Sequence, residues 1–244
     1  IEGIHGRVGL VTDVVLYEDY PPHDFVFLRR ERRWIRGDWQ LLPWLLPRVP
    51  SVNKGLIPND LSIIGRWKIL DNLRRSLLAP ALFLLFVSGW LWLPGSPLAW
   101  TLAGGLTLAV PVLTGLLLGV VKAVSGSPWR QVFRAFQTGF VRWGLELAFL
   151  LYETFLTLSG IATTLVRLFV TRKHLLQWTS YAETVRVFAG GVTINQILGT
   201  SLSTGAVAAL IILIDPRALI VASPLLIIWL LSPVIAWWIS RPID

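Results

Sequence analysis

The sequence predicts a mainly α-helical protein that crosses a membrane several times. Hydrophobic residues make up 54% of its 244 residues and charged residues only 15%, and the mean hydropathy is +0.64. Ordinary soluble domains carry a larger charged fraction. Residues 76–121 contain no charged side chain at all. Runs of this kind are typical of helices that span the hydrocarbon core of a bilayer.

Charge and cysteine content narrow the function classes. The net charge of +8 is typical of membrane proteins whose cytoplasmic loops face anionic lipid, and it also suits an anionic substrate. The absence of cysteine excludes disulfides and thiolate metal sites. The three histidines are far apart in the sequence, so we expect no metal site in this chain. We also expect no nucleic-acid partner.

Residues 1–56 have the frequent charges and short apolar runs of a soluble domain. We expect a short strand within residues 9–18 because β-branched side chains are concentrated there. A helix is expected over residues 25–42, with Asp24 as its N-cap. Two prolines then make the following stretch irregular.

Residues 57–76 predict an amphipathic helix at the membrane interface, with Asn59 or Asp60 as its N-cap. Its apolar residues recur at helical spacing and its basic residues surround them. The apolar set is Ile63, Trp67, Leu70 and Leu73, and the basic set is Arg66, Lys68, Arg74 and Arg75.

Four membrane-spanning helices are expected in two hairpins, residues 77–121 and 196–240. The first hairpin reverses at a PGSP loop and the second at an Asp-Pro-Arg loop. Residues 122–195 are mixed in composition, and the apolar stretch 140–178 is interrupted by charges. We expect amphipathic interface helices there, with an additional span at 140–178 as the alternative.

The distribution of basic residues predicts the orientation. Of the 22 lysines and arginines, only Arg217 falls in a loop on the side opposite the N-terminal portion. The positive-inside rule therefore places residues 1–75, residues 122–195 and the C-terminus in the cytoplasm. The remaining tryptophans are expected mostly at the membrane interfaces, where indoles are enriched.

Residues 29–40 (RRERRWIRGDWQ) concentrate cations and indoles. A helical step of about 100° per residue brings Arg30, Arg33, Trp34 and Gly37 onto one face. Guanidinium groups bind phosphate oxygens bidentately, and an indole offers a flat apolar surface to a sugar. A glycine inside a helix costs about 1 kcal/mol relative to alanine, which indicates close approach by another group. This face suits a sugar nucleotide and a sugar acceptor.

A simpler interpretation is that the arginine cluster flanks the membrane spans and contacts lipid headgroups, as arginines and tryptophans often do. Two features favour a binding site. Gly37 shares the face, and the first expected span starts more than thirty residues later. Asp38 either orients Arg33 or Arg36 through a hydrogen bond or is solvated, and the sequence leaves both open.

The residues Arg30-Glu31-Arg32-Arg33-Trp34 fit the (Q/R)-x-x-R-W signature of processive family-2-like glycosyltransferases. Beyond this motif, three ordered blocks resemble the cyclic β-1,2-glucan synthases, the glycosyltransferase family 84 module. The blocks are VTDVVLYEDYP, RRERRWIRGDWQLLPWLLPRVP and RWKILDNLRRSL. The similarity extends through VTRKHLLQWTSYAE to the final span.

The resemblance implies a bacterial inner-membrane synthase that transfers glucosyl units from UDP-glucose to a growing cyclic β-1,2-glucan. It implies that Arg33 contacts the donor diphosphate, that Trp34 borders the acceptor sugar and that Arg30 takes the Gln/Arg position. Gln40 lies in the family block and is expected near the acceptor. A divalent cation, Mg²⁺ or Mn²⁺, is implied as well, with its ligands outside this chain.

The chain itself is interpreted as an internal fragment. Glu2-Gly3 resembles the family's E-G pair, so the general base is expected upstream of Ile1 and no catalytic residue within the chain. The resemblance implies a glycosyltransferase half upstream and a phosphorylase-like domain downstream, and residues 1–56 become the acceptor-side remnant of a family-2-like α/β domain. The fragment alone is expected to be inactive. The alternatives are another processive synthase, making cellulose-like or hyaluronan-like chains, and a non-catalytic membrane scaffold that binds lipid through its arginines.

Overall fold

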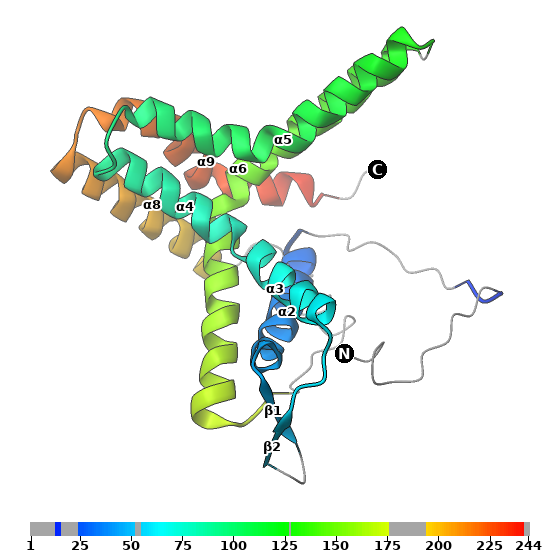
Figure 1. Ribbon diagram of the computed structural model, residues 1–244. Helices are drawn as coiled ribbons and strands as arrows, with labels where there is room; N and C mark the ends of the chain where they lie inside the picture. Colours follow the sequence, from blue (N-terminus) through cyan, green and yellow to red (C-terminus); the bar gives the residue numbers. More distant parts are fainter. Residues whose placement is uncertain (1–12, 16–23, 52–54, 127, 176–193, 242–244) are drawn as a thin grey trace. The chain divides into compact units, whose positions relative to one another are not determined.

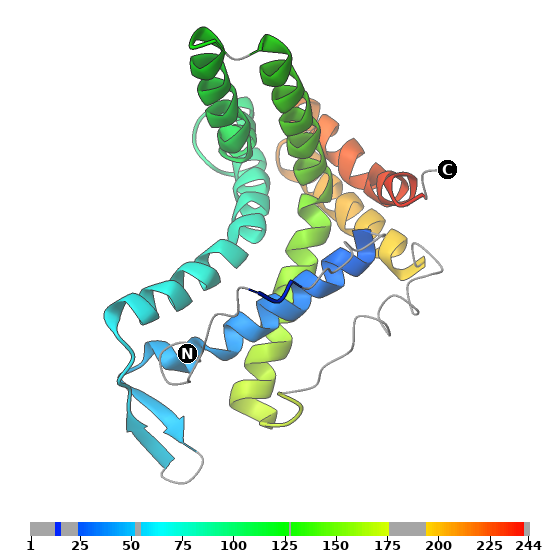
Figure 2. The ribbon, with the colours of Figure 1, turned by 90° about the vertical axis from the view of Figure 1, so that its right-hand side faces the viewer.

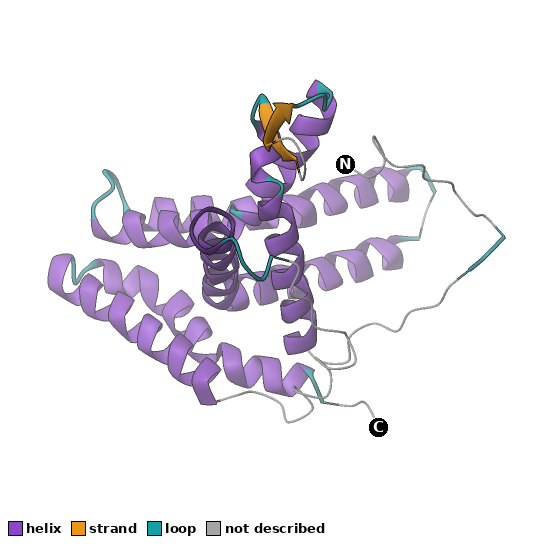
Figure 3. Cartoon of the chain, turned by 90° about the horizontal axis from the view of Figure 1, so that it is seen from below, coloured by secondary structure: helices purple, strands orange, loops and turns teal. Residues whose placement is uncertain are grey.

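The computed structural model describes residues 13–15, 24–51, 55–126, 128–175 and 194–241. The strand expected over residues 9–18 lies almost wholly outside this part of the chain, and so does the Glu2-Gly3 pair. Among the described residues, helix dominates, and the strands form a single hairpin (Figure 3). The chain divides into two compact units, residues 1–78, 156–191 and 239–244, and residues 79–155 and 192–238.

The first unit begins with helix α2 (Asp24–Gln40), followed by a 3₁₀ turn, η1 (Leu42–Leu45). Two short strands follow, β1 (Arg48–Ser51) and β2 (Gly55–Pro58), and then helix α3 (Ile63–Ser76). The strands pair antiparallel, with Val49 opposite Ile57. The sequence predicted α2 within two residues at each end, but it did not predict that the proline-rich stretch folds into a hairpin.

Asn59 has a different role from the one expected. The N-cap of α3 is Ser62, whose side chain accepts a hydrogen bond from the Gly65 backbone N–H. The Asn59 amide instead donates to the carbonyls of Trp44, at 2.6 Å, and Leu46, at 2.8 Å. Its carbonyl accepts from the Leu61 backbone N–H at 3.1 Å. Asn59 therefore closes the base of the hairpin, where an unbonded polar group would be costly.

Part of the expected apolar stripe of α3 is buried, and the rest is exposed. Leu73 is buried with Ile69 and Leu61, against side chains of α2 and η1. Ile63 and Trp67 are 86% and 61% exposed. An exposed apolar surface beside basic residues is typical of a helix that lies in the headgroup region.

The second unit contains two helical hairpins, α4 (Leu78–Leu91) with α5 (Pro97–Val124), and α8 (Ile194–Ile214) with α9 (Ala218–Ile239). Both short connections lie at the same end of this unit (Figure 1). Helix α6 (Trp129–Leu165) belongs to this unit up to Phe155 and to the first unit from Leu156 onward. A π-helix, η2 (Val166–Thr171), follows α6 directly. The two hairpins agree with those expected from the sequence.

In the part of the chain that the structure describes, three helical segments are long and apolar enough to cross a membrane: α5, α6 with η2, and α9. Helices α3 and α4 meet the same criterion together as a pair bent by 44°, which raises the number to four. The described part of α8 is a shorter apolar segment, Leu198–Ile214. A mainly α-helical, multi-pass membrane protein is thereby confirmed. That α6 meets the criterion supports the alternative of a further span in residues 140–178.

Buried tryptophans organise the core of the second unit. The rings of Trp90 and Trp229 are 1% and 0% exposed, with centroids 5.9 Å apart. Trp90 donates its indole N–H to the Thr101 hydroxyl at 2.8 Å, and Trp229 donates to the Leu147 carbonyl at 3.0 Å. These two indoles are core residues and do not form the interfacial belt expected from the sequence. Their N–H groups have partners because an apolar surrounding offers no water.

Glycine allows α4 and α5 to approach each other closely. A Cβ added to Gly89 would meet the Trp100 Cβ and lie 2.8 Å from the Trp100 Cγ. By contrast, a Cβ added to Gly115 of α5 would meet nothing within 4 Å. The close contact at Gly89 is therefore specific to the hairpin and is not a general feature of its glycines.

We expect Gly89→Ala to lower the free energy of unfolding by about 1–3 kcal/mol, because the added methyl forces the helices apart. Gly115→Ala is the matched control and should be neutral or slightly stabilising, since alanine favours the helix. Thermal unfolding of the chain in detergent micelles measures both changes. Equal effects of the two substitutions would contradict the close packing of α4 on α5.

Candidate functional site

Helix α2 carries the predicted site residues, and one of its sides packs against α3. Trp39 donates its indole N–H to the Ser76 hydroxyl at 3.0 Å. One turn nearer the middle of α3, the Asn72 amide donates to the Asp38 carboxylate at 3.4 Å. The Trp39 ring also packs against the buried cluster that includes Leu73. Asp38 and Trp39 are therefore directed toward α3.

A second side of α2 packs against the last turns of α6, which α2 crosses (Figure 2). Ile35 is buried, at 7% exposed. A Cβ added to Gly160 of α6 would lie 3.5 Å from the Arg32 Cγ and 3.7 Å from the Ile35 Cγ2. Further along, Gln40 donates its side-chain amide to the Leu175 carbonyl at 2.8 Å. Gly160 thus permits the crossing, and Gln40 fixes the end of α2.

The remaining side of α2 carries Arg30, Arg33, Trp34 and Gly37, which we call the α2 strip. Trp34 is 54% exposed, and the Arg30 guanidinium carbon lies 4.9 Å from the centre of its ring. Arg33 is half-buried. A Cβ at Gly37 would meet nothing within 4 Å in the described structure. The glycine is therefore not required by packing against α3 or α6, and the space beside it is open.

The six predicted site residues separate into two groups. Arg30, Arg33, Trp34 and Gly37 share the α2 strip. Asp38 and Gln40 lie on the two packed sides, where each has a hydrogen-bonding partner within the protein. Neither of the two interpretations of Asp38 describes its contact, since its hydrogen bond is to Asn72 of a neighbouring helix.

Two pKa shifts accompany this packing. Burial raises the pKa of Asp38 above its ordinary value, although the hydrogen bond from Asn72 and the nearby Arg75 oppose the shift. Burial lowers the pKa of Arg36, and the neighbouring cations Arg167 and Arg32 lower it further. The first shift indicates a carboxyl group that interacts weakly with cations, and the second indicates crowding of positive charge.

Sequence reasoning missed Arg167 and the residues that follow it. The Arg167 guanidinium donates to the His174 carbonyl at 2.9 Å, across a turn in which Arg172 and His174 have left-handed backbone conformations. Arg167 stands 131 positions after Arg36 in the sequence. No local spacing connects the two residues, and only the crossing of α2 and α6 brings them close.

Within the described ranges, no group of three His, Asp or Glu side chains is placed to hold a metal ion. The described residues therefore offer no ligand set for a divalent cation, whose ligands the resemblance places outside this chain. The candidate site is cationic and aromatic, and it suits an anion beside a sugar ring.

The fold and this site together define a multi-pass, mainly α-helical membrane protein with a cationic and aromatic helix face. No model of a protein family matches the chain. Along 99% of its length the chain is 32% identical, over 251 residues, to the cyclic β-(1,2)-glucan synthase NdvB of Rhizobium meliloti (strain 1021). The chain corresponds to 8% of that relative's length. The resemblance to the cyclic β-1,2-glucan synthases is thereby confirmed, and the chain is similar to a segment of this relative.

We expect Asp38→Asn to leave the protein at least as stable as the wild type at neutral pH. The folded-state pKa of Asp38 lies above its unfolded value, so its contribution to stability is present at low pH and is lost as the pH rises through the folded pKa. Asparagine stays neutral and still accepts the Asn72 hydrogen bond. Thermal unfolding between about pH 4 and pH 7 measures the difference, which should shrink as the pH falls toward the ordinary carboxyl pKa. A clear loss of stability at pH 7 would mean that the charge itself stabilises the helix pair.

Proposed function

We propose that the chain is the membrane segment of a glucan synthase that transfers glucosyl units from UDP-glucose to a growing cyclic β-1,2-glucan. The observation that carries the proposal is the match to a cyclic β-(1,2)-glucan synthase along 99% of the chain. The open α2 strip supports it, because the strip offers guanidinium groups and an indole at one place. The transferase activity belongs to a longer polypeptide, with the general base and the carboxylates for a divalent cation outside this chain.

In this proposal Arg33 binds the diphosphate of the donor. A guanidinium fork makes two charge-assisted hydrogen bonds to phosphate oxygens and balances the charge that develops on the leaving nucleotide. The proposed orientation has the α2 strip on the cytoplasmic side, where sugar nucleotides are made, and the membrane is the bacterial inner membrane. The strong positive charge of residues 29–36 supports this orientation.

Trp34 is the proposed platform for the acceptor sugar. The Arg30 guanidinium lies over the indole at 4.9 Å, so this contact covers one face of the ring and leaves the other for a sugar. Gly37, one turn further along, adds no side chain that would block the approach. Asp38 and Gln40 act indirectly in this arrangement, since their contacts hold α2 in place.

Two alternative functions predict different experimental results. Another processive synthase would use the same strip but make a different linkage, which methylation analysis of the product identifies. A lipid-binding scaffold would bind anionic vesicles in a salt-sensitive manner, and UDP-glucose would not protect the α2 strip from chemical modification. The exposed Ile63 and Trp67 of α3 suit membrane contact under every one of these functions.

Replacing Arg33 by alanine in the full-length synthase should reduce glucan synthesis from UDP-glucose by about 100-fold or more, because a preorganised charge on the donor diphosphate is lost. Membrane insertion should be unchanged. The measurement is incorporation of labelled glucose into β-1,2-linked product, with Arg48→Ala, an exposed arginine of β1, as the matched control. Wild-type activity of the Arg33 variant would remove the assignment.

A further inference from the structure

A second group of arginines lies on the side of α2 that faces α6. We call Arg32, Arg36 and Arg167 the α2–α6 guanidinium cluster. Arg32 lies against Gly160, and Arg36 is one turn further along α2. Gln40 at the end of α2 reaches Leu175 in the turn after η2, so the C-terminal half of α2 passes the segment that carries Arg167. Arg32 and Arg167 are both neighbouring cations of Arg36.

Arg36 has both other cations of the cluster as neighbours. Its Nε atom is buried and makes no hydrogen bond within the described structure. Both neighbouring arginines lower its pKa, so the three cations repel one another in partly desolvated surroundings. Bringing like charges together in this way costs free energy. A bound anion would remove that cost and would satisfy the buried Nε–H.

Arg167 lies in a π-helix that is followed by a tight turn. The end of α6 widens into the π-helix η2 (Val166–Thr171), a form often found at functional sites. The chain then turns at Arg172 and His174, which have φ of 52° and 59°. Arg167 donates to the His174 carbonyl at 2.9 Å and Gln40 to the Leu175 carbonyl at 2.8 Å. The Arg167 bond closes the turn on η2, and the Gln40 bond attaches the turn to α2.

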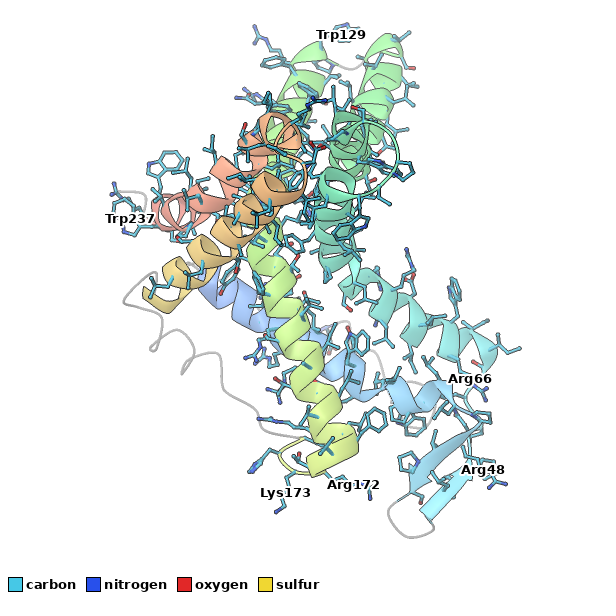
Figure 4. The ribbon with its side chains drawn as sticks, turned by 90° about the vertical axis from the view of Figure 1, so that its left-hand side faces the viewer. Arg48, Arg66, Trp129, Arg172, Lys173 and Trp237 are labelled. Atoms are coloured by element: carbon cyan, nitrogen blue, oxygen red, sulfur yellow. The ribbon has the colours of Figure 1, made fainter. Side chains whose placement is uncertain are left out.

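The surface of the same turns is amphipathic. Phe169 and Val170 of η2 are 58% and 74% exposed. Arg172 and Lys173 are exposed and lie at the turn after α6 (Figure 4). Exposed apolar side chains next to lysine and arginine are typical of a segment that enters the headgroup region of an anionic membrane. A soluble phosphate compound would need the cations but not the apolar side chains.

We propose that the α2–α6 guanidinium cluster binds the phosphate group of an anionic phospholipid, with η2 inserted among the neighbouring lipids. This site is separate from the α2 strip, and the proposal rests on the multi-pass membrane fold, not on the glucan synthase function. The bound headgroup lies between α2 and α6, so it also strengthens the attachment of α2. An anionic membrane would in this way stabilise the position of the α2 strip.

The test is a native mass spectrometry titration of the intact chain in detergent with phosphatidylglycerol, and with phosphatidylcholine for comparison. Arg36→Gln should weaken retention of phosphatidylglycerol by about tenfold, the order expected for loss of one charge-assisted hydrogen-bonding group. Arg48→Gln removes the same charge from β1 of the same unit and should leave retention unchanged. Binding of phosphatidylcholine, which has no net charge, should be weaker throughout.

Folding and ligand identity are checked in parallel. In lipid-free detergent, Arg36→Gln should unfold at the same temperature as the wild type or higher, because it relieves repulsion within the cluster. Arg36→Lys keeps the charge but loses the planar fork, and its retention should be intermediate. Equal retention by wild type and Arg36→Gln, or an equal loss in Arg48→Gln, overturns the site. Displacement of the lipid by uridine diphosphate overturns the lipid assignment in favour of a soluble nucleotide.

Discussion

Helix α2 is attached along two of its sides, and these attachments decide which of its side chains remain accessible. Toward α3 they are the hydrogen bonds of Asp38 and Trp39. Toward α6 they are the contact at Gly160 and the hydrogen bond of Gln40. A helix held on two sides cannot rotate about its axis without breaking both sets of contacts. The third side, the α2 strip, is therefore presented in a fixed orientation.

The same physical requirement acts in the apolar second unit. A polar group removed from water needs a partner close by, and the tryptophans of this unit show how the need is met. Trp143 donates to the Gly105 carbonyl at 2.9 Å, and Trp229 donates to the Leu147 carbonyl at 3.0 Å. These bonds join α6 to α5 and to α9. Indoles therefore supply both the bulk of the core and specific links between helices.

Much of the fold could be predicted from the composition of the sequence and from the positions of residues that interrupt its apolar runs. The two helical hairpins follow from uncharged runs broken at Pro94–Pro97 and at Asp215-Pro216-Arg217. Helix α2 and its α2 strip follow from the period of the helix. The roles of individual glycines could not be predicted, because the sequence around Gly37 and Gly160 does not distinguish a helix crossing from open space. Only the structure shows that Gly160 allows a helix crossing, whereas Gly37 faces open space.

The rest depends on contacts between segments distant in sequence. Asn59 or Asp60 was expected to cap α3, but Ser62 is the cap, and the Asn59 amide donates to the carbonyls of Trp44 and Leu46 instead. Asp38 was expected to orient Arg33 or Arg36 or to be solvated, and Gln40 was expected near the acceptor. Their hydrogen-bonding partners lie 34 and 135 positions away, and no local spacing predicts them. Burial of Trp90 and Trp229 depends on the packing of α5, α6, α8 and α9 with α4 into one cluster, and hydropathy alone does not predict it.

Cysteine scanning tests the two-sided attachment of α2 most directly, since the chain contains no cysteine of its own. Four variants of the native protein, each with a single cysteine at position 34, 35, 37 or 39, would be treated with a water-soluble maleimide. The account predicts fast labelling of Trp34→Cys and Gly37→Cys and slow labelling of Ile35→Cys and Trp39→Cys. Uniform labelling along the helix, or the reverse pattern, would contradict it.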